Sequence, residues 1–435
     1  MVRPIRVLWT ANIVLPVAAR LLGLDETPFG GWLSVTTQRL AQRKDLQIGI
    51  AMRAPIVRLQ RLEHDGIIYF ALPQRRTDIY DVAQSDCDRV LDDFAPDILH
   101  AEGTEMRYTQ RLMESWRGPR LVSLQGVING YAAHQFGGLG PGDFLNWRRP
   151  RHALVGAALL GNDRLRFRPR LEPERQTIAL ADHILGRTIW DRAQAAWLNP
   201  EARYHHCPRI LRDAFYGRAW ESGQHEPFTI FVGNGASALK GVHFVVRAAA
   251  RLRHRYPRLR LVIAGRDPNT LSPFSAQRLV GYSAWLRDLI VDQDMAGHVE
   301  FTGQLDAVQM ADRMCRSHIF VLPSLIENSP NTLAEAMLMG VPSVSAYTGG
   351  VPSMAADERE VLMYRAEDPA MLAYQIGRLF DDPALCRRLS EAARTRARGV
   401  HDPEAIIDTL VGIYRHIEAE SAGRWVTGAQ TQALS

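Results

Sequence analysis

Short apolar runs alternate with helix-length segments along this chain of 435 residues, and that alternation limits the folds open to it. The runs are too short for helices and lack alternating polar residues, which is typical of parallel strands buried on both faces. In the first half they are Ile5–Trp9, Gln47–Met52, Ile67–Phe70, Ile98–Ala101, Arg120–Leu124 and His183–Gly186. Helical segments such as Gly31–Arg43 and Asp78–Phe94 separate some of them, so the first half predicts an α/β fold.

A second series of the same kind begins near Pro227. Its predicted strands are Phe228–Val232, Arg260–Ala264, Val299–Phe301, Ile319–Leu322 and Ser343–Ser345. Its predicted helices are Val242–Tyr256, Ser283–Asp292, Ala307–Arg316, Thr332–Met339 and Pro369–Phe380. Two consecutive series predict two Rossmann-like, doubly wound domains facing each other across a cleft.

The boundaries follow from composition. The segment His205–Gln224 is polar and aperiodic, which favours a linker, so we predict an N-terminal domain at 1–215 and a C-terminal domain at 216–400. Apolar positions at helical spacing predict a last helix at 401–421, packing back toward the N-terminal domain. The remaining residues, 422–435, are expected to be a frayed tail.

Composition excludes several classes of protein. Hydrophobic residues are 46% and charged residues 23%, which rules out a disordered chain. No window approaches eighteen apolar residues, so no membrane span is predicted. Four cysteines without paired spacing favour a reducing cytoplasm. The net charge of +5 is concentrated locally, and we expect no nucleic-acid partner.

The strongest motif is LPSLIENSPNTLAEAMLMGVPSVSAYTGGVPS, from Leu322 to Ser353. A strand ends at Leu322, and a helix begins near Asn331, where free N–H groups attract phosphate. Glu327 and Glu335 would repel a phosphate but accept hydrogen bonds from sugar or ribose hydroxyls. Together these groups indicate a nucleotide-sugar site. The alternative is that Glu327 caps the helix through solvent and Glu335 is a solvated helix position.

The stretch ENSPNTLAEAMLMGVPSV…GGVPS closely resembles the C-terminal motif of glycosyltransferase family 4, the retaining GT-B glycosyltransferases. FTIFVGNGASALKGVHFVVRAAARL, LRLVIAGRDP and HVEFTGQLDAVQMADRMCRSHIFVLPS also resemble that family, in its usual order. FGGWLSVTTQRLA, PDILHAEGTE and LVSLQGVINGYAAHQFGGL resemble a polysaccharide-assembly branch more weakly. The resemblance implies a GT-B fold.

The resemblance also implies roles for individual residues. Glu335 would bind the ribose hydroxyls, Glu327 the donor-sugar hydroxyls, and Lys240 the leaving diphosphate. Backbone N–H groups of the loop and helix start would hold the diphosphate and the sugar, at Asn328, Ser329, Asn331, Thr332 and Leu333. Gly30 and Gly31 would let the N-terminal backbone approach the same phosphates.

Two positions depart from the family pattern. Many members have an arginine where this chain has Gly235, and Arg266 is the candidate replacement, with a surface arginine as the alternative. Many members also have a histidine directly after the strand that ends LVSL, where this chain has Gln125-Gly126. His134, in a glycine-rich loop, is then the candidate for the sugar-facing side, with a structural histidine as the alternative.

Lys240 stands out without the resemblance as well. Lys44 and Lys240 are the lysines of this chain, and the other basic residues are arginine. Lys240 lies in GNGASALKG, a glycine-rich turn between a strand and a helix that lacks the P-loop pattern. The alternative is an ordinary lysine on a helix surface.

The segment Arg148–Arg175 joins arginine clusters to a short apolar run. It would touch anionic lipid at the inner face of the cell membrane, or a lipid-diphosphate acceptor. The alternative is a solvated helix pair packed on the N-terminal domain. His205-His206-Cys207 invites a metal site, but adjacent residues of an extended segment point opposite ways, and we expect no metal.

We therefore expect a metal-independent, retaining hexosyltransferase with no bound cofactor. Its co-substrate would be a nucleoside-diphosphate-sugar, with UDP-sugar favoured and GDP-sugar as the alternative. The acceptor would be a lipid-linked or oligosaccharide hydroxyl, reached by front-face displacement. Alternatives are a GT-B-like epimerase or phosphorylase and a non-catalytic nucleotide-sugar-binding subunit. A dehydrogenase is disfavoured because no GxGxxG follows an early strand.

Overall fold

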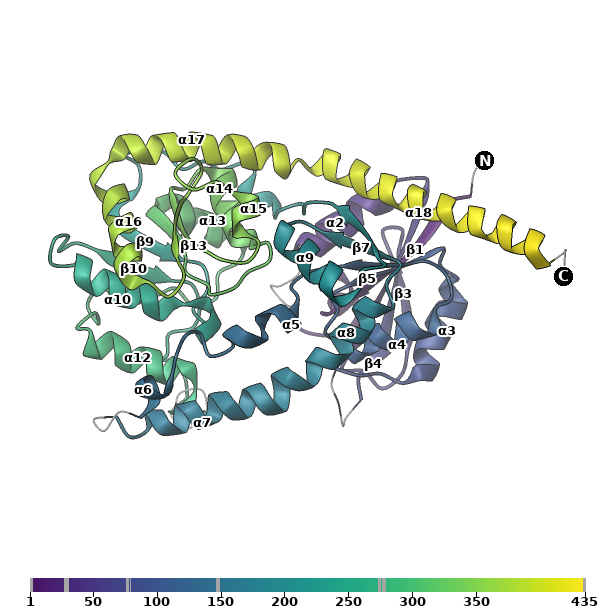
Figure 1. Cartoon of the computed structure of the whole chain (residues 1–435), viewed down its shortest axis with the longest axis horizontal. Helices are drawn as coiled ribbons and strands as arrows, with labels where there is room; N and C mark the ends of the chain where they lie inside the picture. Colours follow the sequence, from purple (N-terminus) through teal and green to yellow (C-terminus); the bar gives the residue numbers. More distant parts are fainter. Residues whose placement is uncertain are drawn as a thin grey trace. The chain divides into compact units, whose positions relative to one another are not determined.

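The computed structural model describes residues 3–26, 31–75, 78, 80–145, 149–272, 275 and 279–432, with side chains up to residue 422. The chain divides into two compact units. The first unit is Met1–Asn129, Pro169–Ile210 and His401–Ser435, and the second is Gly130–Arg168 and Leu211–Val400. Each unit is built on its own mainly parallel sheet, so the predicted pair of α/β domains is confirmed (Figure 1).

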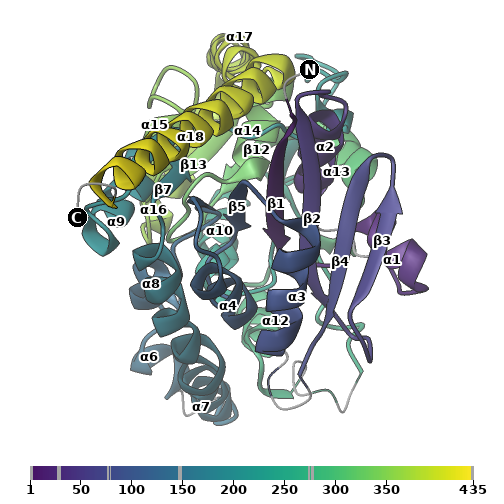
Figure 2. The same cartoon turned by 90° about the vertical axis from the view of Figure 1, so that its right-hand side faces the viewer.

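The sheet of the first unit has the strand order β3-β4-β2-β1-β5-β6-β7-β8. Its strands are β1 (Ile5–Ala11), β2 (Leu46–Ala54), β3 (Gln60–His64), β4 (Ile67–Pro73), β5 (Ile98–Glu102), β6 (Arg120–Ser123), β7 (His183–Gly186) and β8 (Arg203–His206). Figure 2 shows β3, β4, β2 and β1 side by side. Strand β3 pairs antiparallel with β4, and the other described pairs are parallel.

The two edge strands of this sheet, β3 and β8, do not follow from the sequence pattern. Both are largely solvent-exposed and polar, so neither carries the apolar run that marks a buried strand. His205 and His206 were placed in the linker, but they belong to β8.

The helices of the first unit are α1 (Pro16–Leu22), α2 (Gly31–Ala41), α3 (Gln84–Phe94), α4 (Arg107–Ser115), α8 (Leu171–Ala179), α9 (Ile189–Leu198) and α18 (Pro403–Gln432). Helix α18 packs on α2, β1 and β5 through Ile406, Leu410, Tyr414 and Ile417. It continues to Gln432, where the sequence had suggested a frayed tail from 422. The helical backbone therefore extends beyond the last apolar position that marked it.

The sheet of the second unit is parallel throughout, in the order β11-β10-β9-β12-β13-β14. Its strands are β9 (Glu226–Val232), β10 (Arg260–Ile263), β11 (Val299–Phe301), β12 (Ser317–Leu322), β13 (Ser343–Tyr347) and β14 (Leu362–Arg365). Strand β14 was not predicted, because its apolar run is very short. It lies at the edge of the sheet beside β13.

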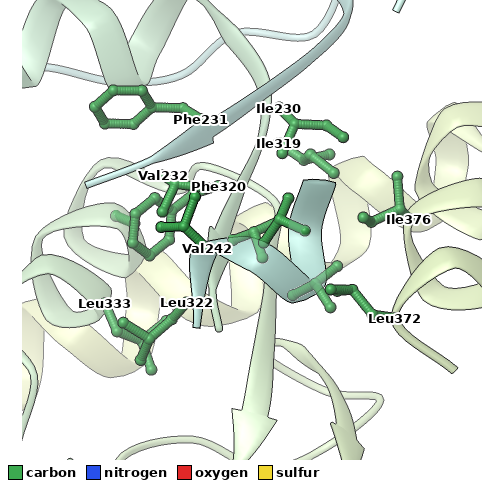
Figure 3. Packing of buried hydrophobic residues seen from close by; sticks show 14 of the residues in the cluster. Ile230, Phe231, Val232, Val242, Ile319, Phe320, Leu322, Leu333, Leu372 and Ile376 are labelled. Atoms are coloured by element: carbon green, nitrogen blue, oxygen red, sulfur yellow. The ribbon is translucent and has the colours of Figure 1, made fainter. Parts of the chain in front are cut away.

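Helices cover this sheet: α10 (Val242–Leu252), α12 (Tyr282–Asp292), α13 (Ala307–Arg316), α14 (Asn331–Met339), α15 (Val351–Met354), α16 (Pro369–Asp381) and α17 (Pro383–Val400). The core lies between sheet and helices. Figure 3 shows Phe231, Phe320 and Leu322 of the strands near Val242 of α10 and Leu333 of α14. Burying this much aliphatic and aromatic surface is the main stabilising contribution to the unit.

The segment 130–168 groups with the second unit, although it lies within the range 1–215 assigned to the N-terminal domain. It holds α6 (Pro141–Phe144) and α7 (His152–Asn162) and follows the short helix α5 (Ile128–Tyr131). Arg151 and His152 of α7 bond the carboxylate of Asp288 in α12. These partners are far apart in sequence, so no local pattern could reveal the grouping.

Within the described ranges, no helix combines the length and the apolar character needed to cross a lipid bilayer.

Candidate active site in the second unit

Three loops meet at the carboxyl ends of β9, β12 and β13. The loop after β9 bonds the loop after β12, because the N–H of Leu325 donates to the carbonyl of Leu239 at 3.0 Å. The loop after β13 bonds it too, because the N–H of Gly350 donates to the carbonyl of Glu327 at 2.9 Å. The motif around Glu327 is thus held from both sides, at the sheet edge where open α/β domains bind ligands.

Two glycines make this approach possible. Gly241 has φ +67°, and a Cβ there would lie 2.0 Å from the carbonyl oxygen of Pro323. Gly349 has φ +49°, and a Cβ there would lie 2.0 Å from the carbonyl oxygen of Glu327. Both positions combine a left-handed backbone with a contact that no side chain tolerates, so glycine is required.

Lys240 and Glu327 form an ion pair at this edge. The Nζ of Lys240 donates to Oε1 of Glu327 at 2.5 Å, and the two side chains are 30% and 11% exposed. Lys240 comes from the short 3₁₀ turn Ala238–Lys240, just before α10. The structure brings together the cation and the carboxylate that the sequence singled out, and leaves the ammonium partly open to solvent.

The first turn of α14 offers backbone donors beside this pair. Its N-cap is Pro330, which provides no side-chain cap. Ser329, Asn331 and Thr332 have N–H groups without an acceptor among the described residues. Such donors at a helix N-terminus, together with the helix dipole, attract an anion.

Two other members of the predicted set are already engaged. The N–H of Asn328 donates to the hydroxyl of Tyr131 at 2.9 Å. The N–H of Leu333 donates to the carbonyl of Pro330 at 3.1 Å, and the Leu333 side chain is in the core. The roles assigned to Asn328 and Leu333 stay predictions. Tyr131 itself was missed, because only the fold brings residue 131 to this loop.

Glu335 lies one turn into α14 and is 1% exposed. Its two oxygens accept from Arg212, at 2.7 Å from Nε and 2.8 Å from Nη2. Burial raises the pKa of Glu335, against the lowering effect of the guanidinium. Arg212 was missed because it lies in the polar segment assigned to the linker.

Packing accounts for Gly235, the position where the family pattern has an arginine. A Cβ at Gly235 would lie 2.7 Å from the Cγ2 of Ile263, so a larger residue does not fit. The N–H of Gly235 donates to the carbonyl of Ala264 at 3.3 Å. Arg266 lies two residues after Ala264 and is exposed. Its side chain has no ion pair or hydrogen bond to any part of the chain that the structure describes.

The predicted N-terminal domain at 1–215 included His134, but the structure groups this residue with the second unit. It ends the 3₁₀ turn Ala132–His134 and is half-buried. Gly137, three residues on, packs against the carbonyl of Ala238 and accepts from His243 Nε2 at 3.0 Å. The turn of His134 is thus anchored near the turn of Lys240. Contact of its imidazole with a sugar stays a prediction.

The predicted pair Gly30-Gly31 is only half described. Gly30 lies outside the described residues, and Gly31 begins α2 of the first unit. Their approach to the phosphates stays a prediction.

His205 and His206 end strand β8 of the first unit, and Cys207 follows directly. His205 contacts His183 at 3.1 Å, and burial raises the pKa of Cys207 to about 11. Among the described residues, no group of three or more His, Cys, Asp or Glu side chains is arranged to hold a metal ion.

The loops of this site lie in a stretch that is similar to a known family. Residues 226–382 match the model of the family described as glycosyl transferases group 1. D-inositol 3-phosphate glycosyltransferase 1 of Catenulispora acidiphila is 25% identical over 431 residues, covering 95% of this chain and 97% of that protein. The α-D-kanosaminyltransferase of Streptomyces kanamyceticus is 28% identical over 228 residues, covering 50% of this chain and 55% of that protein.

Solved structures agree on the fold. Sucrose-phosphate synthase of Thermosynechococcus elongatus superposes with a TM-score of 0.69 at 17% identity, covering 96% of this chain and 100% of that chain. HepE of Anabaena, solved in complex with UDP, superposes with a TM-score of 0.63 at 15% identity, covering 95% of this chain and 100% of that chain. The family match spans the loops of Lys240, Glu327 and Glu335. The likeness to these solved structures shows that the chain has the GT-B fold.

Proposed function

We propose that this chain is a glycosyltransferase that moves a sugar from a nucleoside diphosphate to an acceptor hydroxyl with retention of the anomeric configuration. The pairing of Lys240 with Glu327, beside the uncapped start of α14, carries this proposal. The site joins a cation and N–H donors, which suit a diphosphate, to a carboxylate, which suits sugar hydroxyls. A carboxylate would repel a lone anion, so its presence favours a ligand that also carries hydroxyls.

In this proposal the donor displaces the carboxylate from Lys240. The ammonium and the N–H groups of Ser329, Asn331 and Thr332 stabilise the charge that develops on the leaving diphosphate. Glu327 then accepts a hydroxyl of the donor sugar. Arg266, the exposed arginine beyond the tight position at Gly235, supplies the second cation.

The reaction follows front-face displacement. The bond from the anomeric carbon to the diphosphate breaks, and its electrons stay on the diphosphate oxygen. The acceptor oxygen bonds the same face of that carbon and gives its proton to the departing diphosphate. No side chain acts as a nucleophile in this scheme, and no bound metal or cofactor is required, because the cations and N–H groups carry the charge.

UDP is the favoured nucleotide, with GDP as the alternative. Solved HepE binds UDP and UDP-glucose, and this chain shares the fold with it. Glu335 would accept the ribose hydroxyls. The test is calorimetric binding of UDP, GDP and ADP to the wild type and to Glu335→Gln. Weaker binding of every nucleotide by the variant is expected, and unchanged affinity would remove the ribose assignment.

The transferase reaction itself is tested by hydrolysis of UDP-, GDP- and ADP-sugars and by transfer to lipid-linked and oligosaccharide acceptors. Retention is read from the anomeric proton of the product. Conversion of the donor sugar without an acceptor would point to an epimerase instead. Binding of nucleotide-sugar without any turnover on the acceptor panel would point to a non-catalytic subunit.

A peripheral contact with anionic lipid is also proposed, through the helical segment 149–175. Leu154 is 59% and Leu165 is 79% exposed, and Arg164 and Arg166 beside them are exposed too. Exposed leucines flanked by arginines suit an anionic membrane surface. Sedimentation with anionic vesicles should weaken in Leu154→Ser/Leu165→Ser but not in Leu21→Ser, an exposed leucine on α1. Equal sedimentation with neutral vesicles would contradict the proposal.

A further inference from the structure

The carboxylate of Glu335 is buried almost completely, and that burial creates a problem for a nucleotide site. A buried carboxyl without a cation takes up a proton, because desolvation penalises its charged form. A protonated carboxyl loses part of its accepting capacity and becomes a donor. To accept two ribose hydroxyls, Glu335 needs a partner that keeps it ionised.

Arg212 has the geometry of such a partner. Its Nε and Nη2 donate in parallel to the two oxygens of Glu335, at 2.7 and 2.8 Å. This bidentate arrangement fixes the plane of the carboxylate as well as its charge. A carboxylate offers two acceptor sites on each oxygen, so Arg212 leaves one site on each oxygen unused.

The guanidinium is itself held in place. It lies over the ring of Phe215, with its Cζ 4.7 Å from the ring centroid, and Phe215 is fully buried. The short 3₁₀ helix Asp213–Phe215, which follows Arg212, packs on α13 and α14. The Arg212 side chain keeps 23% of its surface exposed, so it reaches the edge of the site and is not simply part of the core.

We propose that Arg212 is a positioning residue for the donor nucleotide, which holds Glu335 ionised and oriented so that its remaining acceptor sites receive the two ribose hydroxyls. The inference rests on the proposed function, because it takes ribose as the ligand of Glu335. It extends the site to a residue outside the sequence motif.

The test compares Arg212→Gln, Arg212→Lys and the control Arg218→Gln. Arg218 lies six residues along the same segment and pairs with Asp312. Calorimetry measures the affinity for UDP and for 2′-deoxy-UDP, and steady-state kinetics separate KM for the donor from kcat. Arg212→Gln should reduce the affinity for UDP at least 10-fold and remove the preference for UDP over 2′-deoxy-UDP. In the kinetics, the loss should appear mainly as a higher KM for the donor. Arg218→Gln should match the wild type.

Arg212→Lys keeps the positive charge but loses the bidentate contact with Glu335. Its UDP affinity and its preference for UDP over 2′-deoxy-UDP should therefore fall between those of the wild type and Arg212→Gln. It also carries the test if Arg212→Gln does not fold. Wild-type affinity and wild-type ribose preference in a folded Arg212 variant would overturn the inference. Failure of the proposed function looks different, because Glu335→Gln would then bind UDP like the wild type and the wild type would show no ribose preference.

Discussion

The ammonium of Lys240 donates to the carboxylate of Glu327 at 2.5 Å, although 87 positions separate the two residues. The contact exists because β9 and β12 are neighbours in the sheet, so the loops that follow them lie side by side. Without a donor, each group neutralises the other. In the proposed reaction, Lys240 meets the diphosphate and Glu327 meets the sugar of the donor.

Lys240→Ala is expected to reduce kcat for sugar transfer roughly 10²-fold or more, comparable to losing one donor that stabilises transition-state charge. Lys240→Arg should remain strongly impaired, because a forked guanidinium does not replace a compact ammonium. The measurement is steady-state transfer at saturating donor. Lys44→Ala, at the exposed lysine of the first unit, is the matched control. Wild-type kcat in Lys240→Ala would exclude a role at the diphosphate.

Gly241→Ala should destabilise the second unit by about 1–3 kcal/mol, because it forces a left-handed residue and a clash with the Pro323 carbonyl. Activity should fall as well, because the loop of Lys240 must withdraw from the loop of Glu327. Gly412→Ala is the control, since nothing lies within 4 Å of its Cβ position. Helix α18 should gain roughly 0.5–1 kcal/mol there. Urea denaturation followed by circular dichroism measures both effects, and equal stability of the two variants would be inconsistent with this geometry.

Asp288→Ala should loosen the contact between α7 and α12 within the second unit. Asp288 is 3% exposed and accepts from Arg151 and His152, each at 2.9 Å. Although burial raises the pKa of Asp288, those hydrogen bonds hold it below the usual range. The expected loss is on the order of 1–3 kcal/mol, with faster proteolysis in 149–162. Asp408→Ala is the control, because it breaks an exposed ion pair with Arg43. It should lower the free energy of unfolding by under about 1 kcal/mol. Unchanged protease resistance in Asp288→Ala would argue against this anchor.

Acid should destabilise both units before their carboxylates titrate. Burial lowers the pKa of His100 in the first unit and of His243 in the second to about 3. The unfolded imidazoles have a pKa of about 6.5, so between pH 6.5 and 3 the unfolded chain binds protons that the folded chain excludes. Stability is therefore complete above pH 6.5 and falls as the pH drops, by up to about 1.4 kcal/mol per pH unit for each histidine.

Urea denaturation between pH 4 and 7 measures that slope. His100→Gln should make the slope shallower, because one buried imidazole with a lowered pKa is gone. His254→Gln, at an exposed position of the second unit, should leave it as in the wild type. A slope in His100→Gln equal to that of the wild type would show that His100 is protonated equally in both states.

Local patterns predicted most of the buried strands, because burial on both faces of a sheet demands an apolar run that can be read directly. They predicted several helices but not α17 (Pro383–Val400). The same logic fails at sheet edges. Strands β3 and β8 are polar and exposed, and β14 has a very short apolar run, so none stands out from a loop. The motif from Glu327 to Glu335 was readable because a strand, a loop and a helix start follow one another without interruption.

The sequence alone determined the α/β class, the position of the motif from Leu322 to Ser353 and the prominence of Lys240. Only the tertiary structure joined Lys240 to Glu327, assigned 130–168 to the second unit, brought Tyr131 to Asn328 and paired Arg212 with Glu335. It also gave the reason for Gly235, whose Cβ would collide with Ile263. These relationships depend on which strands become neighbours, and that choice is made by the packing of the whole core and not by any local run of residues.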